Sequence, residues 1–521
     1  MTTLTPEPIV RLENAFRDPY DLAIATARTC YAPRVISTDD VHKDEEARAQ
    51  RDRIAESIYK AGHHTTIQHA TFQFVLERVS RQFIWSFLHS HPHYNSEQVS
   101  QRYVEVKPEH FTIPPLEEPA RTVYLETIHH QMEAYQRLIQ LIEPLVEREY
   151  RRLFPRRDVE EKRWHSVVRK RAQEVARYVL PVATHAHLYH TISGLTLYRY
   201  HRLCETFDCP LEQKLVVQRM MEEVTKIDPQ FLKLAEDPMP LNQTLEYQVF
   251  LQLVDKMSEQ GKREFLEEFD RDLNGLTSKL VDYKVNGAAS MAQAVRSVLG
   301  LTKAQLADAA AIDLVMNPAK NHYLAEALNL STLSKLTRTM VHPHFTFKKK
   351  LSHTADSQDQ RHRTTPASRP VLARHLLADR PDYVTPVLIK SDPAVQAYYE
   401  EVMHVVWQGI TRLLHAGVAE EYVMYLLPNA FPIRFEESGD LLSLHHKWTK
   451  RLCYTAQEEI WNACREEVLQ VHAVAPQLVE HIAAPCTLRQ GAREKPYCPE
   501  GDRFCGVAVW KLNVEDYARL I

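Results

Sequence analysis

Four side chains in one short stretch are of types that can bind an anion. Residues 356–370, DSQDQRHRTTPASRP, hold Arg361, His362, Arg363 and Arg369 within nine positions. The chain as a whole has a formal net charge of −4, with 64 Lys and Arg against 68 Asp and Glu, so it is not built to coat nucleic acid. The cluster therefore indicates either a local anion site or a basic helical face in solvent, with His362 a structural histidine.

A second group of donors has the types that a phosphate requires. The stretch NSEQVSQRYV, residues 95–104, holds Ser100 and Arg102, and ARYVLP, residues 176–181, holds Arg177. Arginine forks and hydroxyl or backbone donors are the natural partners of a dianionic phosphate. A solvated polar loop with a surface arginine is the alternative for an S-x-R pattern taken alone.

The last forty residues hold a possible metal site. Cys486, Cys498 and Cys505 lie among Gly and Pro turns with His481 nearby, and three thiols and an imidazole could hold a structural zinc. Their spacing lacks the close C-x-x-C pair of common zinc sites, so buried or free thiols are the alternative. Eight cysteines in 521 residues do not make a disulfide framework.

The elements that must position these groups occur twice in the same order. Phe72, Phe74 and Leu76 alternate as in a strand, and so do Phe345 and Phe347. Each strand follows a helix-like stretch, at 18–33 and 288–300. Each half then has an amphipathic helix, at 127–154 and 394–417, a segment ending in Leu-Pro, at 172–181 and 419–428, and a last helical region. We therefore expect two copies of one α+β domain, although two unrelated domains are the alternative.

The composition fits this expectation. A 521-residue chain with 44% apolar residues can bury a large core and suggests two or more domains. No run of about 18 apolar residues is present. The first residues, MTTLTPEPIV, have neither the basic segment nor the apolar segment of a secretory signal peptide. We expect a cytoplasmic protein without a membrane span.

These motifs resemble the flavin-dependent thymidylate synthases. That family shows H-x-x-F-x-F, R-H-R, N-E-x-S-x-R-Y, A-R-x-x-L-P and a late helix with R-x-x-x-x-A-Q-x-E-I. The second half has HPHFTF at 342–347, RHR at 361–363, Arg451 and AQEEI at 456–460. The first half has GHHTTIQHATFQF at 62–74, then the Ser100 loop and Arg177. The resemblance implies two tandem domains, each a small antiparallel or mixed sheet packed on long helices.

Each half keeps motif residues that the other has lost. Counting from the histidine of H-x-x-F-x-F puts Leu88 at the position of Arg361. The first half therefore has LHS, residues 88–90, where the second half has RHR. Counting from the Leu-Pro proline puts Met424 at the position of Arg177, and Cys204 at that of Arg451. The loop after RHR, TTPASRP, is too short for N-E-x-S-x-R-Y. Because family sites lie between subunits, the resemblance implies composite sites formed by both halves.

The resemblance assigns roles to named residues. It implies a nucleotide site, in which Gln358 could pair with a pyrimidine edge and Arg361 lies one helical turn further on. Gln68 replaces a usual glutamate, and Leu442 replaces an expected arginine. The implied catalytic residues are Arg361, Ser100 and Arg451; the substrate-binding residues are Ser100, Gln101, Arg102, Arg177, Gln358, Arg361 and Arg451; and the flavin-binding residues are His63, Thr65, Gln68, Arg361, His362, Arg363, Asp440 and His446.

The implied activity is methylation of dUMP to dTMP with FAD, using methylenetetrahydrofolate and NADPH as co-substrates. None of the cysteines is required to act. Two alternatives stay open: a related flavoenzyme acting on another pyrimidine nucleotide or forming a hydroxymethyl product, and a non-catalytic nucleotide-binding or scaffold protein. The expected domains are 1–240, a helical linker at 241–275, 276–485 and a tail at 486–521. If the family tetramer is built of single domains, two fused chains give a homodimer.

Overall fold

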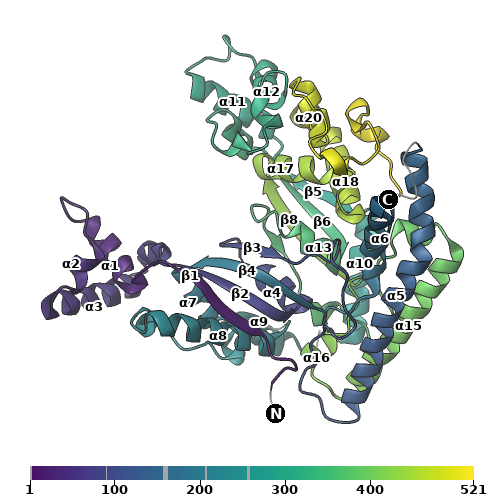
Figure 1. Ribbon diagram of the computed structural model, residues 1–521. Coiled ribbons are helices and arrows are strands. Elements are labelled where there is room, and N and C mark those ends of the chain that lie inside the picture. The colour runs from purple at the N-terminus through teal and green to yellow at the C-terminus, as the bar shows by residue number, and fades with distance from the viewer. Residues whose placement is uncertain (1–2, 90, 156–161, 206–207, 255–257) are drawn as a thin grey trace.

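The computed structural model describes residues 3–89, 91–155, 162–205, 208–254 and 258–521. It contains two four-stranded antiparallel sheets with strand orders β1-β2-β4-β3 and β5-β6-β8-β7 (Figure 1). The strands are β1 Ile9–Ala15, β2 Thr71–Ser80, β3 Tyr94–Gln98, β4 His185–Ser193, β5 Ser278–Tyr283, β6 His344–Ser352, β7 Ala367–Ser368 and β8 Pro432–Asp440. The predicted α+β class with two copies of one sheet is confirmed.

Helices surround both sheets. Those of the first half are α1 Pro19–Thr29, α2 Thr38–His42, α3 Glu45–Lys60, α4 Arg81–His89, α5 Ala120–Leu153, α6 Lys162–Ala176, α7 Gly194–Arg202 and α8 Pro210–Ile227. Later helices are α9 Leu245–Leu253, α10 Glu259–Leu273, α11 Gly287–Leu299, α12 Asp308–Met316, α13 His353–Asp359, α14 Val387–Lys390, α15 Pro393–His415, α16 Glu420–Met424, α17 Leu441–Arg451, α18 Glu458–Val474, α19 Pro476–Val479 and α20 Pro485–Gly491. Two 3₁₀ helices matter below, η1 His64–His69 and η2 Arg177–Val179.

The strand registers show which residues of the two halves are equivalent. Phe72 pairs with Ile192 in the first sheet, and Phe345 pairs with Gly439 in the second. The second pairing runs without interruption to Ser352, whereas β2 has a bulge between Glu77 and Val79. The extra residue is Arg78, with φ +56°. Positions beyond the bulge are therefore shifted by one residue relative to a count from the motif histidine.

The two halves exchange matching hydrogen bonds at their Leu-Pro segments. Val182 N donates to Leu427 O at 2.8 Å, and Asn429 N donates to Leu180 O at 2.8 Å. Between these two hydrogen bonds, Pro181 and Pro428 lie opposite each other as the partners of an isolated antiparallel β-bridge. A reciprocal pattern of this kind is the signature of an isologous contact, here within one chain.

A second matched contact fixes the start of α4 and α13. The carboxylate of Glu212 accepts from Ser80 N and Oγ and from the Tyr425 hydroxyl of the other half. Glu459 accepts in the same way from Ser352 N and Oγ and from the Tyr178 hydroxyl. Ser80 and Ser352 also accept from the amides of Phe83 and Ala355 as helix caps. Each half thus supplies one hydroxyl to the other's cap.

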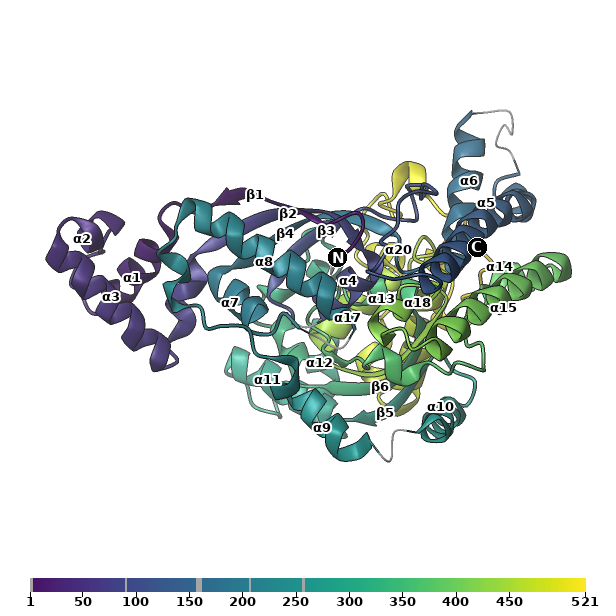
Figure 2. The same ribbon diagram turned by 90° about the horizontal axis from the view of Figure 1, so that it is seen from below.

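One hydrophobic core joins the halves. Helices α5 and α15 lie side by side (Figures 1 and 2), and their buried residues share a cluster with both Leu-Pro segments. Gly409 of α15 faces Thr127 of α5, and a Cβ at Gly409 would lie 2.2 Å from Thr127 Oγ1. The two helices can approach this closely because position 409 has no side chain.

Other segments lie outside this core. Helices α1, α2 and α3 project from the first sheet in both views (Figures 1 and 2). The predicted linker region contains α9 and α10, and the segment after α20 packs Val509, Val514 and Tyr517 against the second half. Within the described ranges, no helix is long and apolar enough to cross a membrane.

Candidate functional site

A cleft of about 550 Å³ lies between the two halves. Its described lining includes seven arginines and lysines but no aspartate or glutamate. Both halves contribute these cations, which are Arg81, Arg102, Arg177, Arg361, Arg363, Lys450 and Arg451. A cavity with this lining favours a negatively charged ligand.

The first half brings the predicted phosphate donors to this cleft. Ser100, Gln101 and Arg102 lie in the loop after β3, and Arg177 lies on η2. Arg177 is only 4% exposed, and its Nε and one terminal nitrogen have no hydrogen-bond partner among the described residues. Burial lowers the pKa of this guanidinium. A buried cation with free donors is costly unless an anion meets it, so Arg177 is suited to bind one.

Arg81 is a cleft residue that the motifs did not reveal. It begins α4 and donates to Gln98 Oε1 at 3.0 Å and to Val99 O at 2.7 Å, which fixes the start of the Ser100 loop. Burial, together with the charge of Arg177, lowers its pKa to about 9. In the sequence, Arg81 is marked only by its place directly after the helix-capping Ser80, and that place does not indicate ligand binding.

The second half brings the RHR turn. Arg361 pairs with Glu97 at 2.6 Å, and Arg363 donates to Asn95 Oδ1 at 3.1 Å, so both reach β3 of the first half. Arg369 does not line the cleft; it pairs with Asp356 at 2.9 Å. The cationic cluster of the sequence therefore divides into three groups at the cleft and one structural ion pair.

Arg451 is positioned by the same turn. Its Nε donates to His362 Nε2 at 2.9 Å, and a terminal nitrogen donates to Gln358 O at 2.7 Å. Burial and the charge of Arg451 hold the pKa of His362 well below its usual range, so the ring is neutral and accepts this bond. Gln358 Nε2 has no hydrogen-bond partner in the part of the chain that the structure describes, so it is available as a donor at the cleft.

Below the turn lies a buried ion network. Asp359 accepts from Lys349 at 3.1 Å and pairs with Lys447 at 2.8 Å, and all three side chains are at most 1% exposed. Glu437 and Glu467 complete the network. Because Asp359 O also accepts from His362 N, at 3.0 Å, the network holds the backbone of the RHR turn.

The first half has aromatic groups at these places. The registers and helix starts align Asp359 with Phe87, Glu437 with His190 and Lys447 with Tyr200. Phe87 packs 4.3 Å from Tyr200 and 5.3 Å from His190, measured between ring centres. An uncharged core therefore replaces the ion network in the half that lacks RHR.

The bulge at Arg78 corrects one sequence alignment. Counted from the matched caps Ser80 and Ser352, the counterpart of Arg361 is His89 rather than Leu88. The counterpart of His362, Ser90, lies outside the described residues. The pairs Arg177 with Met424 and Arg451 with Cys204 do agree with the registers of β4 and β8, and Met424 and Cys204 are buried apolar residues.

Several residues predicted to bind ligand lie elsewhere. His63, Thr65 and Gln68 are exposed around η1 and do not line the cleft. Asp440 also lies outside it, and its carboxylate caps α17 by accepting from Ser443 N at 2.8 Å. The other four predicted flavin-binding residues do line the cleft: Arg361, His362, Arg363 and His446.

Gln101 lines the cleft but has structural partners. Its Nε2 donates to Thr184 at 3.0 Å, and its Oε1 accepts from Asn429 of the second half at 3.1 Å. Its carboxamide therefore connects the halves, which is a different use from the substrate contact that the resemblance implies.

The tail cysteines approach one another and Cys453 around a small cavity. All four thiols are free, and burial raises the pKa of Cys486 to about 12. No group of three or more His, Cys, Asp or Glu side chains within the described ranges is arranged to hold a metal ion. The predicted metal at Cys486, Cys498 and Cys505 therefore has no support in the structure.

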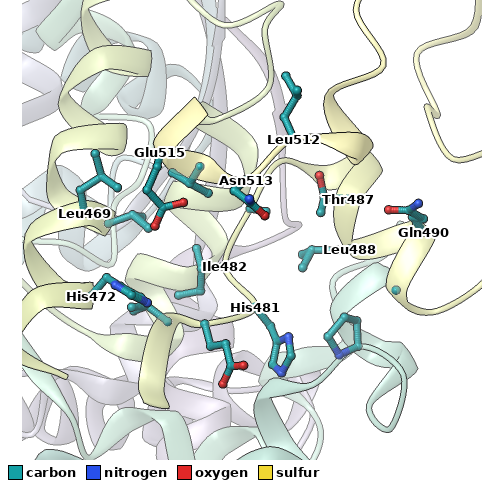
Figure 3. A pocket seen from close by; sticks show the side chains of 17 residues that line it. Leu469, His472, His481, Ile482, Thr487, Leu488, Gln490, Leu512, Asn513 and Glu515 are labelled. Carbon is teal, nitrogen blue, oxygen red and sulfur yellow. The ribbon is translucent and has the colours of Figure 1, made fainter. Parts of the chain in front are cut away.

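His481 does not join these thiols. It lies 3.9 Å from Asp313 and lines a separate cavity of about 240 Å³ among α18, α19, α20 and the tail (Figure 3). Figure 3 also shows His472 and Glu515 at this cavity. None of the predicted catalytic, substrate-binding or flavin-binding residues lines it.

Comparison with known proteins decides the family. The family model described as thymidylate synthase complementing protein matches residues 11–230 and 279–477. The chain belongs to this family. Its two matched regions each contain one of the sheets, which agrees with a tandem arrangement of thymidylate synthase complementing protein domains.

Curated members of the family support this assignment. A flavin-dependent thymidylate synthase of Clostridium tetani is 25% identical over 229 residues, which is 43% of this chain and 85% of that protein. The enzyme of the same name from Corynebacterium diphtheriae is 24% identical over 181 residues, 34% of this chain and 64% of that protein. Among solved structures, a UMP/dUMP methylase PolB from Streptomyces cacaoi, bound with 5-Br dUMP, is 19% identical over 44% of this chain and 94% of that chain, with a TM-score of 0.31.

Proposed function

We propose that the chain methylates dUMP to dTMP as a flavin-dependent thymidylate synthase, with one composite nucleotide site per chain. The observation that carries this proposal is the cleft between the halves, whose described lining has seven cations and no carboxylate. Of these cations, Arg361 and Arg102 are paired with Glu97 and Glu174, which do not line the cleft. Family membership and the names of the curated relatives support the reaction class and a flavin cofactor, and dUMP is the substrate that the resemblance implies.

The chain's own residues suit the nucleotide. Arg177, Arg102 and Ser100 offer charged and hydroxyl donors to a phosphate, and Arg451 and Arg361 approach from the other half. The free Nε2 of Gln358 can donate to a pyrimidine carbonyl. Arg102 is already held by Glu174 at 2.8 Å, so its guanidinium is oriented before the ligand arrives.

The cleft also suits part of a flavin. Arg361, Arg363 and His446 line it, and cationic donors stabilise the anionic edge of a reduced isoalloxazine ring. Bound there, FAD would supply the hydride that completes the methyl group, with NADPH as reductant and methylenetetrahydrofolate as the one-carbon donor. We expect a second copy of the chain to bring His63, Thr65 and Gln68, because they are exposed away from the cleft of their own chain.

The domain boundaries that go with this proposal are 1–240 and 276–485, with the linker at 241–275 and the tail at 486–521. The reciprocal bonds beside Pro181 and Pro428 join the two domains in the way that an isologous contact joins two identical chains. Two fused chains would then form the functional homodimer. Mass measurement by light scattering in solution tests this assembly.

Calorimetric titration of the intact chain with dUMP tests the composite site. We expect one dUMP per chain, because the opposite pairing of halves brings together Met424 and Cys204 in place of Arg177 and Arg451. Two equivalent sites per chain would show that each half binds alone. Product analysis with dUMP, methylenetetrahydrofolate and NADPH separates dTMP from a hydroxymethyl product, and a protein that binds dUMP but no flavin would be a scaffold.

A further inference from the structure

A second cleft adjoins the first and shares Arg102 and Tyr103 with it. Its volume is about 430 Å³. Its walls come from the end of α5, from α6, from the turn at Tyr454 and Thr455, and from two segments of the tail, 502–507 and 518–521. First-half helices and the C-terminal tail therefore enclose it together. Of the residues that the sequence singled out, Arg102 and Tyr103 of the Ser100 loop and Cys505 of the tail line it.

This second cleft carries an excess of positive charge. Six described lining residues are cationic and two are acidic: Arg102, Arg152, Lys170, Arg171, Arg503 and Arg519 against Glu174 and Asp502. Glu174 is already paired, at 2.8 Å with Arg102 and at 2.6 Å with Arg171. Burial opposes its charge, but the two arginines outweigh burial and hold its pKa at about 2.

Arg519 adds a half-buried cation, and no carboxylate bond to it occurs within the described ranges. It donates to Ala456 O at 2.8 Å, lies over the ring of Trp461, and leaves Nε without a partner. Burial and the charge of Arg171 lower its pKa to about 10. An anion in the second cleft would therefore offset the repulsion between Arg519 and Arg171.

The walls also offer flat apolar surface. Five aromatic residues line the cleft: Tyr103, Tyr150, Phe154, Tyr454 and Phe504. Leu153, Val167 and Val507 add aliphatic surface. A lining that combines aromatic faces with arginine forks is suited to a planar ring that carries carboxylates or phosphates.

We propose that the second cleft binds the anionic aromatic end of a co-substrate whose reactive end reaches the nucleotide cleft past Arg102 and Tyr103. This inference rests on the proposed function, which supplies the two candidate sources. One is the aminobenzoyl-glutamate end of a folate, and the other is the adenosine phosphate end of a nicotinamide dinucleotide. Both are planar rings with several negative charges, and the test distinguishes them.

The test uses two unreactive probes, p-aminobenzoyl-triglutamate and 2′,5′-ADP, titrated calorimetrically into the intact chain. The test variant is Lys170→Gln with Arg503→Gln, since both side chains are exposed at the cleft and neither holds the fold together. The matched control is Lys107→Gln with Lys511→Gln, which removes two exposed charges outside the cleft. At fixed salt, we expect at least one probe to bind, and to bind about 10-fold more weakly in the test variant alone.

The outcomes separate this inference from the proposed function. Weakened binding of the triglutamate identifies the folate end, and weakened binding of 2′,5′-ADP identifies the dinucleotide end. Failure of both probes to bind, or equal weakening in the test and control variants, overturns the second site. A parallel titration with dUMP reports on the nucleotide cleft, and a normal dUMP affinity with no effect on either probe would leave the proposed function standing without this inference.

Discussion

Arg177 shows at the scale of one residue how a binding site opposes stability. Its guanidinium is buried with free donors, and the equivalent residue of the other half is Met424, which is 1% exposed in the core. Arg177→Met should therefore raise the Tm of the ligand-free protein by about 1–2 °C, because an unpaired buried cation is replaced by an apolar side chain that this environment accepts.

The same variant should lose nucleotide affinity. Removing a charged donor from a phosphate costs about 1.5–3 kcal/mol, so dUMP should bind roughly 10- to 150-fold more weakly, with the flavin absorbance unchanged. Thermal scans with and without dUMP measure both effects. A variant with lower Tm and normal dUMP affinity would show that Arg177 is a structural residue.

The bulge in β2 is the smallest feature that the sequence could not reveal. Arg78 is exposed and has φ +56°, a conformation that disfavours side chains with a Cβ branch. Arg78→Gly should increase the free energy of unfolding by about 0.5–1 kcal/mol, and Arg78→Val should decrease it. Denaturant titration ranks the three proteins, and a less stable glycine variant would contradict this account.

Gly409 gives a test at the scale of packed helices. Gly→Ala inside a helix usually stabilises by about 1 kcal/mol. At position 409 the added Cβ would meet Thr127 at 2.2 Å, so Gly409→Ala should instead destabilise the chain by about 1–3 kcal/mol. The measurement is the denaturation midpoint.

The double variant Thr127→Ala with Gly409→Ala is the control, because it removes the opposing methyl and hydroxyl groups. It should recover most of the loss, giving a coupling between the two positions. Additive effects would mean that the helices separate without strain.

Much of the element order was predictable from the sequence. Alternation at Phe72 and Phe345 located the central strands, and the recurrence of the Leu-Pro segments indicated two copies of one domain. That these segments contact each other was not predicted. The offset between the copies held at Arg451 and Cys204 but failed at Arg361, because the residue inserted in β2 shifts every later position by one and a count from the motif histidine does not include it.

The site was only partly predictable for a related reason. Residues of familiar motifs, such as Arg102 and Arg361, do meet at the cleft. Arg81 was missed because its role comes from the packing of α4, and Gln101 is used to join the halves through Asn429. Motifs record residue types, whereas a hydrogen bond between residues 328 positions apart depends on the complete fold.

At the scale of the whole molecule, buried histidines predict acid lability. Burial lowers the pKa of four histidines that are nearly inaccessible: His190, His353 and His375 to about 3, and His445 to about 4. In the unfolded chain these groups titrate near pH 6.5. Between about pH 6 and 4 the unfolded state therefore binds more protons, and the stability that the neutral rings contribute above pH 6.5 is lost as the pH falls.

Two acidic groups oppose this loss. Burial raises the pKa of Glu458 to about 7 and that of Asp208 to about 6, so the folded state holds two extra protons near pH 5. Among these six groups the net difference is about two protons, which corresponds to about 3 kcal/mol of unfolding free energy per pH unit. His91 and His185, whose pKa burial lowers to about 4, add to this loss. Denaturant titrations at pH 7, 6 and 5 measure the slope. A stability that rises toward pH 5 would show that the acidic groups dominate.

The reciprocal bonds at the two Leu-Pro segments also affect how the chain is made. Pro181 leaves the ribosome 247 residues before Pro428, its partner in the bridge. At usual elongation rates that interval lasts roughly 10–50 s. During it, the core side of α5 and the segment from Tyr178 to Ala183 have no second half to cover them. Nascent chains of this protein should therefore depend on chaperones that shield this apolar surface until the second copy emerges. In a single-domain relative, the equivalent surface would be covered only when two finished chains associate.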